Sequence, residues 1–445
     1  MRCLYVLMVF ANAAFAQIGA GAAKRTITPD LAKYGPVYMA GFGHNRVATS
    51  IHDDLWTRCL AIGTDRRALV MCGVDSIGLF REDVNRIRDL VKKQAGHDPD
   101  VVVAALHDHQ APDTMGLWGP ASDKSGINEA YNTYVIERTA EAAVEAIKNL
   151  APAKFILAKA HPPVLDTFIN DTRPPVVHDA EVIMLSAVSE SGARIATLIN
   201  WANHPETLAS KNTQITSDFS GFLRDELEKR LGGIAVFING AVGGMQSPLN
   251  AKIEGVGEAT FEKAAYIGQH VADVAADAVL AASTTPLTGF LFAEQEIRIP
   301  VTNAGFQLAT KADLYKGRKP TVAEKTVTSV GLIKLRNGDD TRLTVALIPG
   351  ELYPELSVGG VERYSGADFP DAPIEPAIKS SMDSPYRMLF GLADDEIGYI
   401  IPRAEWDEKE PWLNGASKRW YGEVNSVGPD AAPMIAKTFL DLLKQ

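Results

Sequence analysis

The chain has 445 residues, with 44 Lys or Arg and 55 Asp or Glu, so its formal net charge is −11. This acidic excess argues against nucleic acid as the main partner. Hydrophobic residues make up 46% of the chain, which is typical of a globular protein, and we expect one catalytic domain over residues 17–445.

The N-terminus has the pattern of a secretory signal peptide. Arg2 precedes a mostly apolar stretch, Leu4 to Ala14, which leads into Ala-Phe-Ala at positions 14–16. The small-x-small pattern predicts a signal peptide over residues 1–16, cleaved after Ala16. An uncleaved anchor is the alternative, but the apolar stretch is short for a membrane span of about 20 residues. We therefore expect a secreted or periplasmic protein.

Two cysteines, Cys59 and Cys72, would remain after that cleavage. They lie in two strand-like runs, Leu55–Ile62 and Ala68–Val74, joined by a polar turn at residues 63–67. If the turn is centred on Asp65-Arg66, the cysteines face each other, and export permits a disulfide. The register of a hairpin is uncertain from sequence alone, so we expect two buried thiols, with the disulfide as the alternative.

The next elements bring the first candidate metal ligands. A helix is predicted over Arg81–Gln94 and a strand over Val101–Leu106, which ends in His107 and His109. Side chains in a strand alternate between its faces, so histidines at i and i+2 point the same way. Two imidazoles on one side of a strand end are half of a metal site. A polar loop that happens to hold two histidines is the alternative.

The middle of the chain alternates helices and strands. We predict helices over 128–150, from Ser217 or Asp218 to about 231, and over 257–282, and strands near 154–158, 181–188, 194–199 and 234–238. The strand over 194–199 runs into N-W-A-N-H, which places His204 just beyond a strand end. This residue is the second candidate ligand position along the chain.

The last part of the chain is strand-rich up to a final helix. Residues 287–347 suggest hairpins, with a turn at 337–340, and a helix is predicted over 431–443. The run Leu343–Ile348 ends in P-G-E, which places Glu351 beyond a third strand end. The pattern predicts an α/β fold: a mixed sheet flanked by helices, with a metal site at the loops beyond the strand ends. A His/His/Glu set with an open position is typical of catalytic zinc.

The motifs of the chain resemble, in their order, those of the neutral/alkaline (non-lysosomal) ceramidase family. They run I-G-A-G-A-A-K-R-T-I-T-P, M-A-G-F-G-H, A-L-H-D-H, F-I-N-D-T-R-P-P, I-N-W-A-N-H, I-N-G-A-V-G-G-M-Q-S-P, I-P-G-E, E-I-G-Y-I and Y-G-E-V-N-S-V-G-P. The resemblance covers the catalytic N-terminal domain of that family. We expect no counterpart of the immunoglobulin-like C-terminal domain of its larger members.

The resemblance implies a role for each matching residue and an activity. Zn²⁺ would be held by His107, His204, Glu351 and Tyr399; His109, Arg173 and Tyr421 would handle protons or hold the amide carbonyl; Ser247 would lie near the metal. The implied reaction is hydrolysis of an N-acyl amide, from ceramide or a related N-acyl lipid, by a zinc-activated water. A serine hydrolase is less favoured, because the segment around Ser247 is not G-x-S-x-G.

Three departures from the ceramide-cleaving pattern bear on the substrate. Gln110-Ala111-Pro112 replaces Ser-Gly-Pro, Pro205-Glu206-Thr207 replaces small residues, and Met245-Gln246 replaces Gly-Asp. A small-molecule or lipid amide is the expected partner, with transient contact to a membrane surface as a further expectation. The acidic connection over 352–389 predicts a partly mobile lid and a substrate shorter or more polar than long-chain ceramide. A zinc hydrolase of a smaller amide or ester, or a non-catalytic binding protein, are the alternatives.

Overall fold

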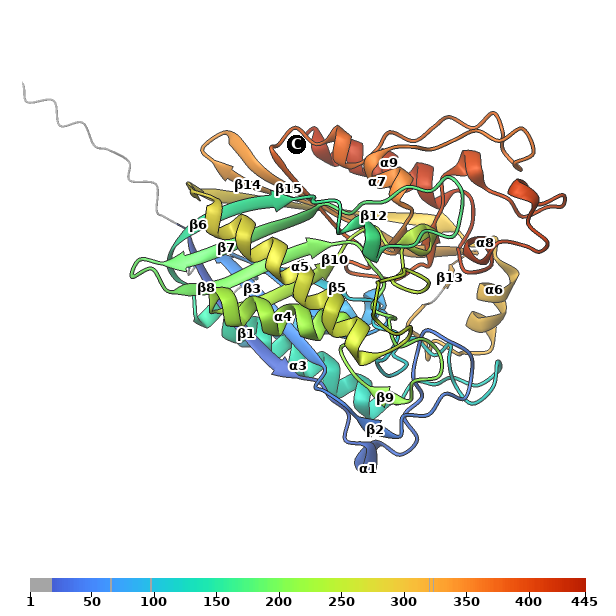
Figure 1. Cartoon of the computed structure of the whole chain (residues 1–445), viewed down its shortest axis with the longest axis horizontal. Coiled ribbons are helices and arrows are strands. Elements are labelled where there is room, and N and C mark those ends of the chain that lie inside the picture. Colours follow the sequence, from blue (N-terminus) through green and yellow to red (C-terminus); the bar gives the residue numbers. More distant parts are fainter. Residues whose placement is uncertain (1–17, 65, 97, 320, 323) are drawn as a thin grey trace, which may run out of the picture.

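The computed structural model describes residues 18–445 except 65, 97, 320 and 323 (Figure 1). The predicted signal peptide, with its cleavage after Ala16, lies outside these residues. Within the described part, no helix combines the length and apolar character that crossing a bilayer requires.

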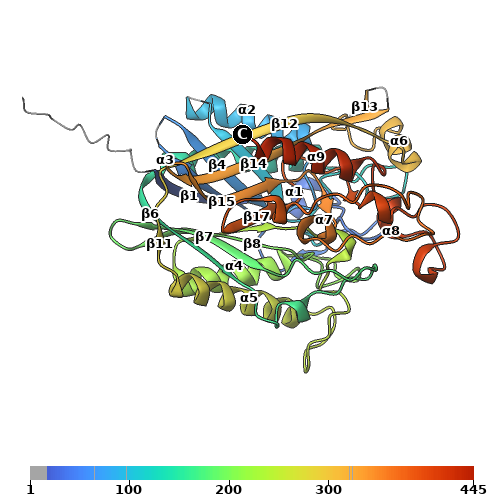
Figure 2. The same cartoon turned by 90° about the horizontal axis from the view of Figure 1, so that it is seen from above.

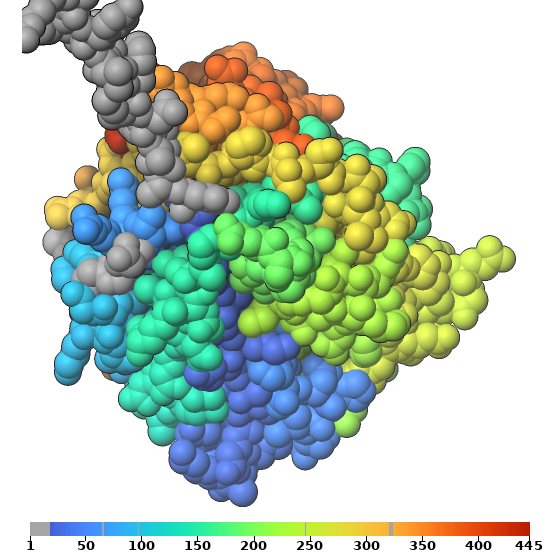
Figure 3. Space-filling model, turned by 90° about the vertical axis from the view of Figure 1, so that its left-hand side faces the viewer, coloured from blue at the N-terminus to red at the C-terminus, as the bar shows by residue number. Residues whose placement is uncertain are grey.

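The larger of two principal sheets is mixed. Its strands run in the order β10-β8-β7-β6-β1-β3-β4-β5, and β11 pairs with β6. The pairs β4–β5 and β8–β10 are parallel and the others antiparallel. The strands are β1 Gly19–Thr26, β3 Trp56–Gly63, β4 Ala68–Val74, β5 Asp100–Ala105, β6 Ala151–Ala160, β7 Val182–Ser189, β8 Arg194–Trp201, β10 Ile234–Asn239 and β11 Thr284–Thr285. Figure 3 shows blue, green, yellow and orange segments side by side at one end of the molecule.

Two pairs of helices cover the outer face of this sheet. Helices α2 (Arg81–Ala95) and α3 (Glu129–Lys148) lie over the β1-β3-β4-β5 half, and α4 (Asp218–Leu231) and α5 (Phe261–Ala281) over the β6-β7-β8-β10 half. The two pairs lie on opposite sides of the molecule in Figure 2, because the sheet curls until β10 contacts β3, β4 and β5. The predicted helices over 81–94 and 128–150 agree with α2 and α3 to within two residues at each end.

A second sheet packs against the inner face of the first. It has the order β12-β14-β15-β17, with β13 paired to β14, and the strands are β12 Gly289–Pro300, β13 Thr321–Val322, β14 Lys325–Asn337, β15 Asp340–Leu347 and β17 Tyr386–Phe390. Leu157 and Ile333 belong to the shared core between the sheets, whereas Ile156 faces the helices, as strand alternation requires. Helix α9 (Ala431–Leu443) covers the far side. The predicted mixed α/β class is confirmed, and the second sheet is an addition to it.

Short elements complete the chain and build the loops. They are α1 Leu31–Tyr34, α6 Ala304–Lys311, α7 Pro354–Val358, α8 Tyr421–Val424, and the two-residue strands β2 Ser50–Ile51, β9 Gln214–Ile215, β16 Glu351–Leu352 and β18 Tyr399–Ile400. Strand β2 pairs with β9 and β16 with β18, both in parallel. Residues 304–311 lie in the part of the chain that was predicted to form strands and hairpins, but they form helix α6.

The two cysteines form a disulfide. Gly63 pairs with Ala68 across the β3–β4 hairpin, and this register sets Cys59 opposite Cys72, which are bonded to each other. The expectation of two buried thiols is therefore wrong. Turn geometry fixes the register of a hairpin, and a one-residue slip would have turned the two side chains to opposite faces.

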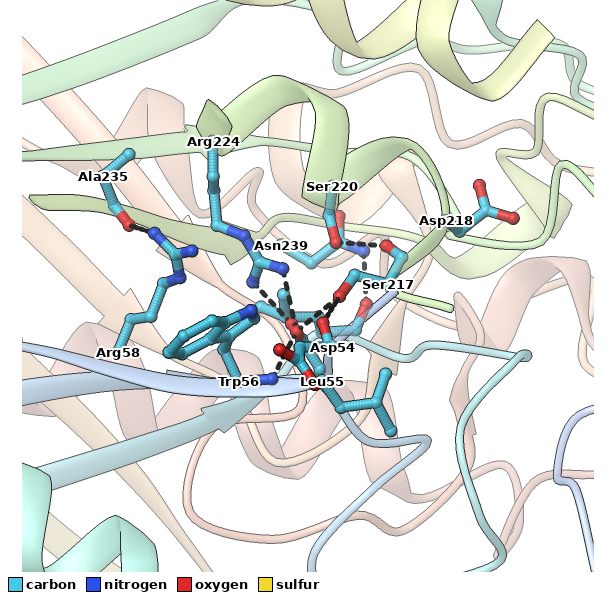
Figure 4. A network of polar contacts seen from close by, with 12 residues as sticks. Asp54, Leu55, Trp56, Arg58, Ser217, Asp218, Ser220, Arg224, Ala235 and Asn239 are labelled. Carbon is cyan, nitrogen blue, oxygen red and sulfur yellow. Dashed lines mark hydrogen bonds and ion pairs between the residues drawn. The ribbon is translucent and has the colours of Figure 1, made fainter. Parts of the chain in front are cut away.

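A buried ion pair ties helix α4 to the larger sheet (Figure 4). Arg224 donates from both terminal nitrogens to Asp75, just beyond β4, at 2.6 and 2.8 Å. The Ser217 hydroxyl and the Trp56 amide donate to the same carboxylate at 2.9 and 2.8 Å. Removing one partner would leave a buried, unpaired charge, so this network fixes the position at which the chain leaves β4.

We expect Asp75→Ala to lower the free energy of unfolding by about 3–5 kcal/mol, because Arg224 stays charged and buried. Urea denaturation measures this. Asp98→Ala is the control, since the Asp98 ion pair with Lys92 is exposed, and it should cost no more than about 1 kcal/mol. Equal losses in the two variants would contradict a stabilising role for the buried pair.

Candidate metal centre

His107 lies in a sharp turn immediately beyond β5. The strand ends at Ala105, and His107 has a φ of 65°, in the left-handed region. The amide of Asp108 donates to the Ser76 carbonyl at 3.0 Å, which fixes the turn against the neighbouring loop. The rings of His107 and His109 lie 4.8 Å apart. The two rings lie together, but the turn at His107, and not the predicted strand alternation, brings them there.

His204 reaches the same place from the loop after β8. Its ring lies 4.9 Å from that of His107 and 5.5 Å from that of His109. One ring nitrogen from each of the three histidines lies within 4.8 Å of the others, and all three side chains are buried. This histidine cluster could hold a metal ion.

The Glu351 carboxylate lies between two of the three imidazoles. Its Oε2 is 3.3 Å from His107 Nε2 and 3.2 Å from His204 Nε2. In a tetrahedral zinc site with bonds of about 2.0–2.1 Å, neighbouring donor atoms are roughly 3.3 Å apart. The spacing of these nitrogen and oxygen donors therefore fits such an ion.

Backbone carbonyls set the orientation of both imidazoles. His107 Nδ1 lies 2.8 Å from the Ile77 carbonyl oxygen, and His204 Nδ1 lies 2.8 Å from that of Gln246. A carbonyl only accepts, so each Nδ1 carries a proton, and Nε2 is the ring nitrogen that faces Glu351. A backbone carbonyl on the second ring nitrogen is the usual support of a metal-binding histidine.

The charges of the cluster are coupled. Burial raises the pKa of Glu351, but the charges of His107 and His204 and their hydrogen bonds outweigh it and lower that pKa. Burial alone would lower the pKa of His204, and the Glu351 hydrogen bond and nearby carboxylates raise it. Metal ligands must be deprotonated, so metal binding would release protons from this cluster and weaken at low pH.

Tyr399 is brought beside Glu351 by a strand pairing of two residues. In the parallel pair β16–β18, Glu351 is the partner of Tyr399. The Tyr399 ring is buried, and burial raises its pKa well above the ordinary value. The predicted fourth ligand therefore lies next to the third, although they are 48 positions apart in the sequence.

His109 is packed against a loop and a carboxylate. The ring of Phe42 lies 5.1 Å away, and Gly41 has a φ of 90° and contacts the imidazole so closely that a Cβ there would lie 2.3 Å from His109 Cγ. Nδ1 of His109 lies 3.2 Å from Glu206 Oε2. Burial and the neighbouring histidine charges lower the pKa of His109 well below its ordinary value.

Ser247 faces a carboxylate and not an imidazole. Its hydroxyl donates to Glu206, and its oxygen accepts from the Leu249 amide at 3.0 Å. A serine nucleophile would need its hydroxyl on a basic histidine, so this contact does not support the serine hydrolase alternative. Glu206 was not among the predicted site residues; its only signal was the departure from small residues after His204.

The Arg173 guanidinium is held by the loops around it. It donates to Glu423 at 2.7 Å, to the Tyr353 hydroxyl at 3.1 Å and to the Glu405 carbonyl at 2.7 Å. Glu423 belongs to α8, the short helix that begins with Tyr421. Arg173 is therefore an anchor of α8, and these contacts occupy three of its five N–H groups.

Tyr421 is the exposed member of a pair of phenols. About half of its side chain is exposed, and its ring lies 5.9 Å from that of buried Tyr399. Tyr421 therefore has solvent on one side and a predicted metal ligand on the other, which is where a group that contacts substrate would lie.

Part of the connection over 352–389, which was predicted to be a partly mobile lid, is buried in the protein core. Tyr353, Leu356 and Met388 are buried in the two cores formed by the second sheet, so they do not line an open trough. Phe369 instead contributes to a groove of about 870 Å³ between residues 368–376 and helix α9. None of the predicted site residues lines that groove.

Loss of one imidazole should empty the metal centre. We expect His204→Ala to abolish stoichiometric metal binding, because the remaining donors no longer enclose an ion. Metal content of the purified protein, measured by elemental analysis, checks this. His161→Ala, at an exposed histidine, is the control and should keep the metal. Full metal content in His204→Ala would refute the ligand assignment.

No family model and no curated protein matches the chain. Among solved structures, a neutral ceramidase from Pseudomonas aeruginosa superposes with a TM-score of 0.72, at 16% identity over 96% of this chain and 74% of that one. A ceramidase complexed with C2 superposes with a TM-score of 0.73, at 15% identity over 96% of this chain and 75% of that one. The chain therefore has the fold of neutral ceramidase, as the order of its motifs predicts.

Proposed function

We propose that the protein is a zinc-dependent amidohydrolase of neutral-ceramidase type, which cleaves an N-acyl amide into a fatty acid and an amine. The observation that carries this proposal is the meeting of two imidazole Nε2 atoms, of His107 and His204, at one oxygen of Glu351, at 3.3 and 3.2 Å. The shared fold with two ceramidases over 96% of this chain supports the same substrate class.

The donor set favours zinc among common metals. Two imidazoles with one carboxylate suit Zn²⁺, whereas Mg²⁺ and Ca²⁺ prefer oxygen ligands alone. We assign His107, His204, Glu351 and Tyr399 as the residues that hold it. When bound, zinc would supply Lewis acidity toward the amide carbonyl and an activated water.

The remaining residues then divide the work of an amide hydrolysis. The oxygen of a water joins the acyl carbon, the C–N bond breaks, and His109 delivers a proton to the leaving nitrogen. The Tyr421 phenol donates a hydrogen bond to the carbonyl oxygen as negative charge develops on it. Arg173 keeps α8, and with it Tyr421, in place through Glu423.

Export is part of the proposal. The signal-like segment over 1–16 supports a secreted or periplasmic protein. The bond between Cys59 and Cys72 supports an oxidising compartment, where such bonds persist.

A smaller amide or ester is the second candidate substrate. It is favoured by the burial of Tyr353, Leu356 and Met388, which removes apolar side chains that a trough for two long chains would need. We therefore propose a preference for a substrate shorter or more polar than long-chain ceramide. No observation favours a non-catalytic binding protein.

Substrate length gives a direct test. We expect zinc-dependent hydrolysis of N-acyl amides in detergent, with kcat/KM highest for short acyl chains, because Tyr353, Leu356 and Met388 are buried in the core and do not offer apolar surface to a long chain. His204→Ala is the inactive control, and matched esters are assayed in parallel. A steady rise of kcat/KM up to long-chain ceramide would contradict the length preference and leave an ordinary ceramidase.

Arg173 should affect turnover and not metal binding. We expect Arg173→Ala to lower kcat about 100-fold at unchanged zinc content, because α8 loses its anchor and the phenol of Tyr421 its position. Glu423→Ala, which removes the other half of the ion pair, should lower kcat to a similar extent. Loss of zinc together with activity would make Arg173 a structural residue of the metal centre.

A further inference from the structure

Glu206 joins two predicted site residues that lie far apart in the sequence. One oxygen accepts the Ser247 hydroxyl, and the other lies 3.2 Å from His109 Nδ1. The carboxylate is almost fully buried, and the His109 amide donates to the adjacent Pro205 carbonyl at 3.0 Å, so the two loops are fixed to each other. A buried carboxylate needs partners of this kind, and these are the ones the fold provides.

The partner of Nδ1 distinguishes His109 from the other two histidines of the cluster. His107 and His204 place Nδ1 on neutral carbonyls, at 2.8 Å each, whereas His109 places it beside a carboxylate. An ionised carboxylate accepts hydrogen bonds and cannot donate one, so it favours the tautomer with the proton on Nδ1, which leaves the lone pair of Nε2 for the proton of the reaction.

The geometry leaves Nε2 of His109 free for that proton. Among the described residues, neither ring nitrogen of His109 makes a well-aligned hydrogen bond. In a substrate-free site, catalytic hydrogen bonds are often long or poorly aligned and tighten when the substrate binds. Gly41 and Phe42 contact the imidazole, so the ring is confined with its Nδ1 beside Glu206.

We propose that Glu206 is a positioning residue, which holds His109 with its proton on Nδ1 so that Nε2 can accept and release the proton of the reaction. The inference rests on the proposed function for the identity of that reaction.

The test uses the zinc-loaded full chain and the variant Glu206→Gln, which keeps the shape of the side chain and removes its charge. We expect zinc content and KM to stay as in the unmodified protein, and kcat to fall about 10- to 100-fold. Glu190→Gln, at an exposed carboxylate, is the matched control and should change neither. Glu206→Asp should recover part of the turnover that Glu206→Ala loses.

A spectroscopic readout separates positioning from a structural role and needs no substrate. NMR of isotope-labelled histidine, with the His109 signals assigned by their loss in His109→Gln, reports which ring nitrogen carries the proton. We expect Nδ1 protonation in the unmodified protein and a mixture of tautomers in Glu206→Gln. An unchanged tautomer and unchanged kcat in that variant would overturn the inference, and so would loss of zinc, which would make Glu206 a ligand. If no N-acyl amide is hydrolysed but the tautomer follows Glu206, the proposed function fails and the pairing stands.

Discussion

The Glu351 carboxylate between two imidazoles is the contact on which the arrangement of this end of the molecule depends. His107 and His204 lie on loops that follow β5 and β8, Glu351 begins strand β16 shortly after β15, and their side chains are withdrawn from water. Removing charges from water costs several kcal/mol per ion unless they are paired with good geometry. The carboxylate satisfies this requirement at 3.2–3.3 Å, either with a shared proton or with a cation in its place. The left-handed backbone at His107, a conformation that costs a non-glycine residue about 1–3 kcal/mol, is maintained because the surrounding contacts determine it.

That contact is precise because each of its members is held by a different part of the fold. The carbonyls of Ile77 and Gln246 orient the two imidazoles, and neither belongs to the loop of the histidine it supports. Ile77 lies two residues after Asp75, which is paired with Arg224 of α4 (Figure 4). The buried ion pair therefore helps to fix the backbone carbonyl that orients His107 in the candidate metal centre. The curl of the larger sheet brings β10 against β4 and β5, which lets the loops after strands from its two ends converge. Packing between the layers thus fixes the positions of the site residues.

What the sequence could predict were features that depend on local pattern. Apolar runs identified the strands that end near His107, His204 and Glu351, and helix α9 was predicted with its observed limits of 431–443 because its periodicity is strong. Features that depend on pairing between distant segments could not be read this way. The pair of Glu351 with Tyr399 rests on two-residue strands, too short to leave a period, and only the family resemblance pointed to it. The turn between β3 and β4 sets the register that joins Cys59 to Cys72. The position of the second sheet depends on the core that it shares with the first. Glu206 belongs to no motif, and its position became visible only when the loops of His109 and Ser247 were seen together.

Residues of the same type receive different roles here from their surroundings. Three histidines lie within a few ångströms of one another. In two of them Nδ1 faces a neutral backbone carbonyl, which suits a metal ligand that must stay uncharged. In His109 it faces a carboxylate, which suits a ring that takes part in proton transfer. The tyrosines repeat the division: buried Tyr399 lies beside Glu351, where only a cation would favour its ionised form, whereas half-exposed Tyr421 remains a hydrogen-bond donor facing solvent. In the proposed reaction, the group that faces the second polar atom of each side chain therefore decides whether that side chain binds the metal or transfers a proton. A comparison of motifs alone does not reveal that partner: Glu206 belongs to no motif, yet it lies 3.2 Å from the ring that is proposed to transfer the proton.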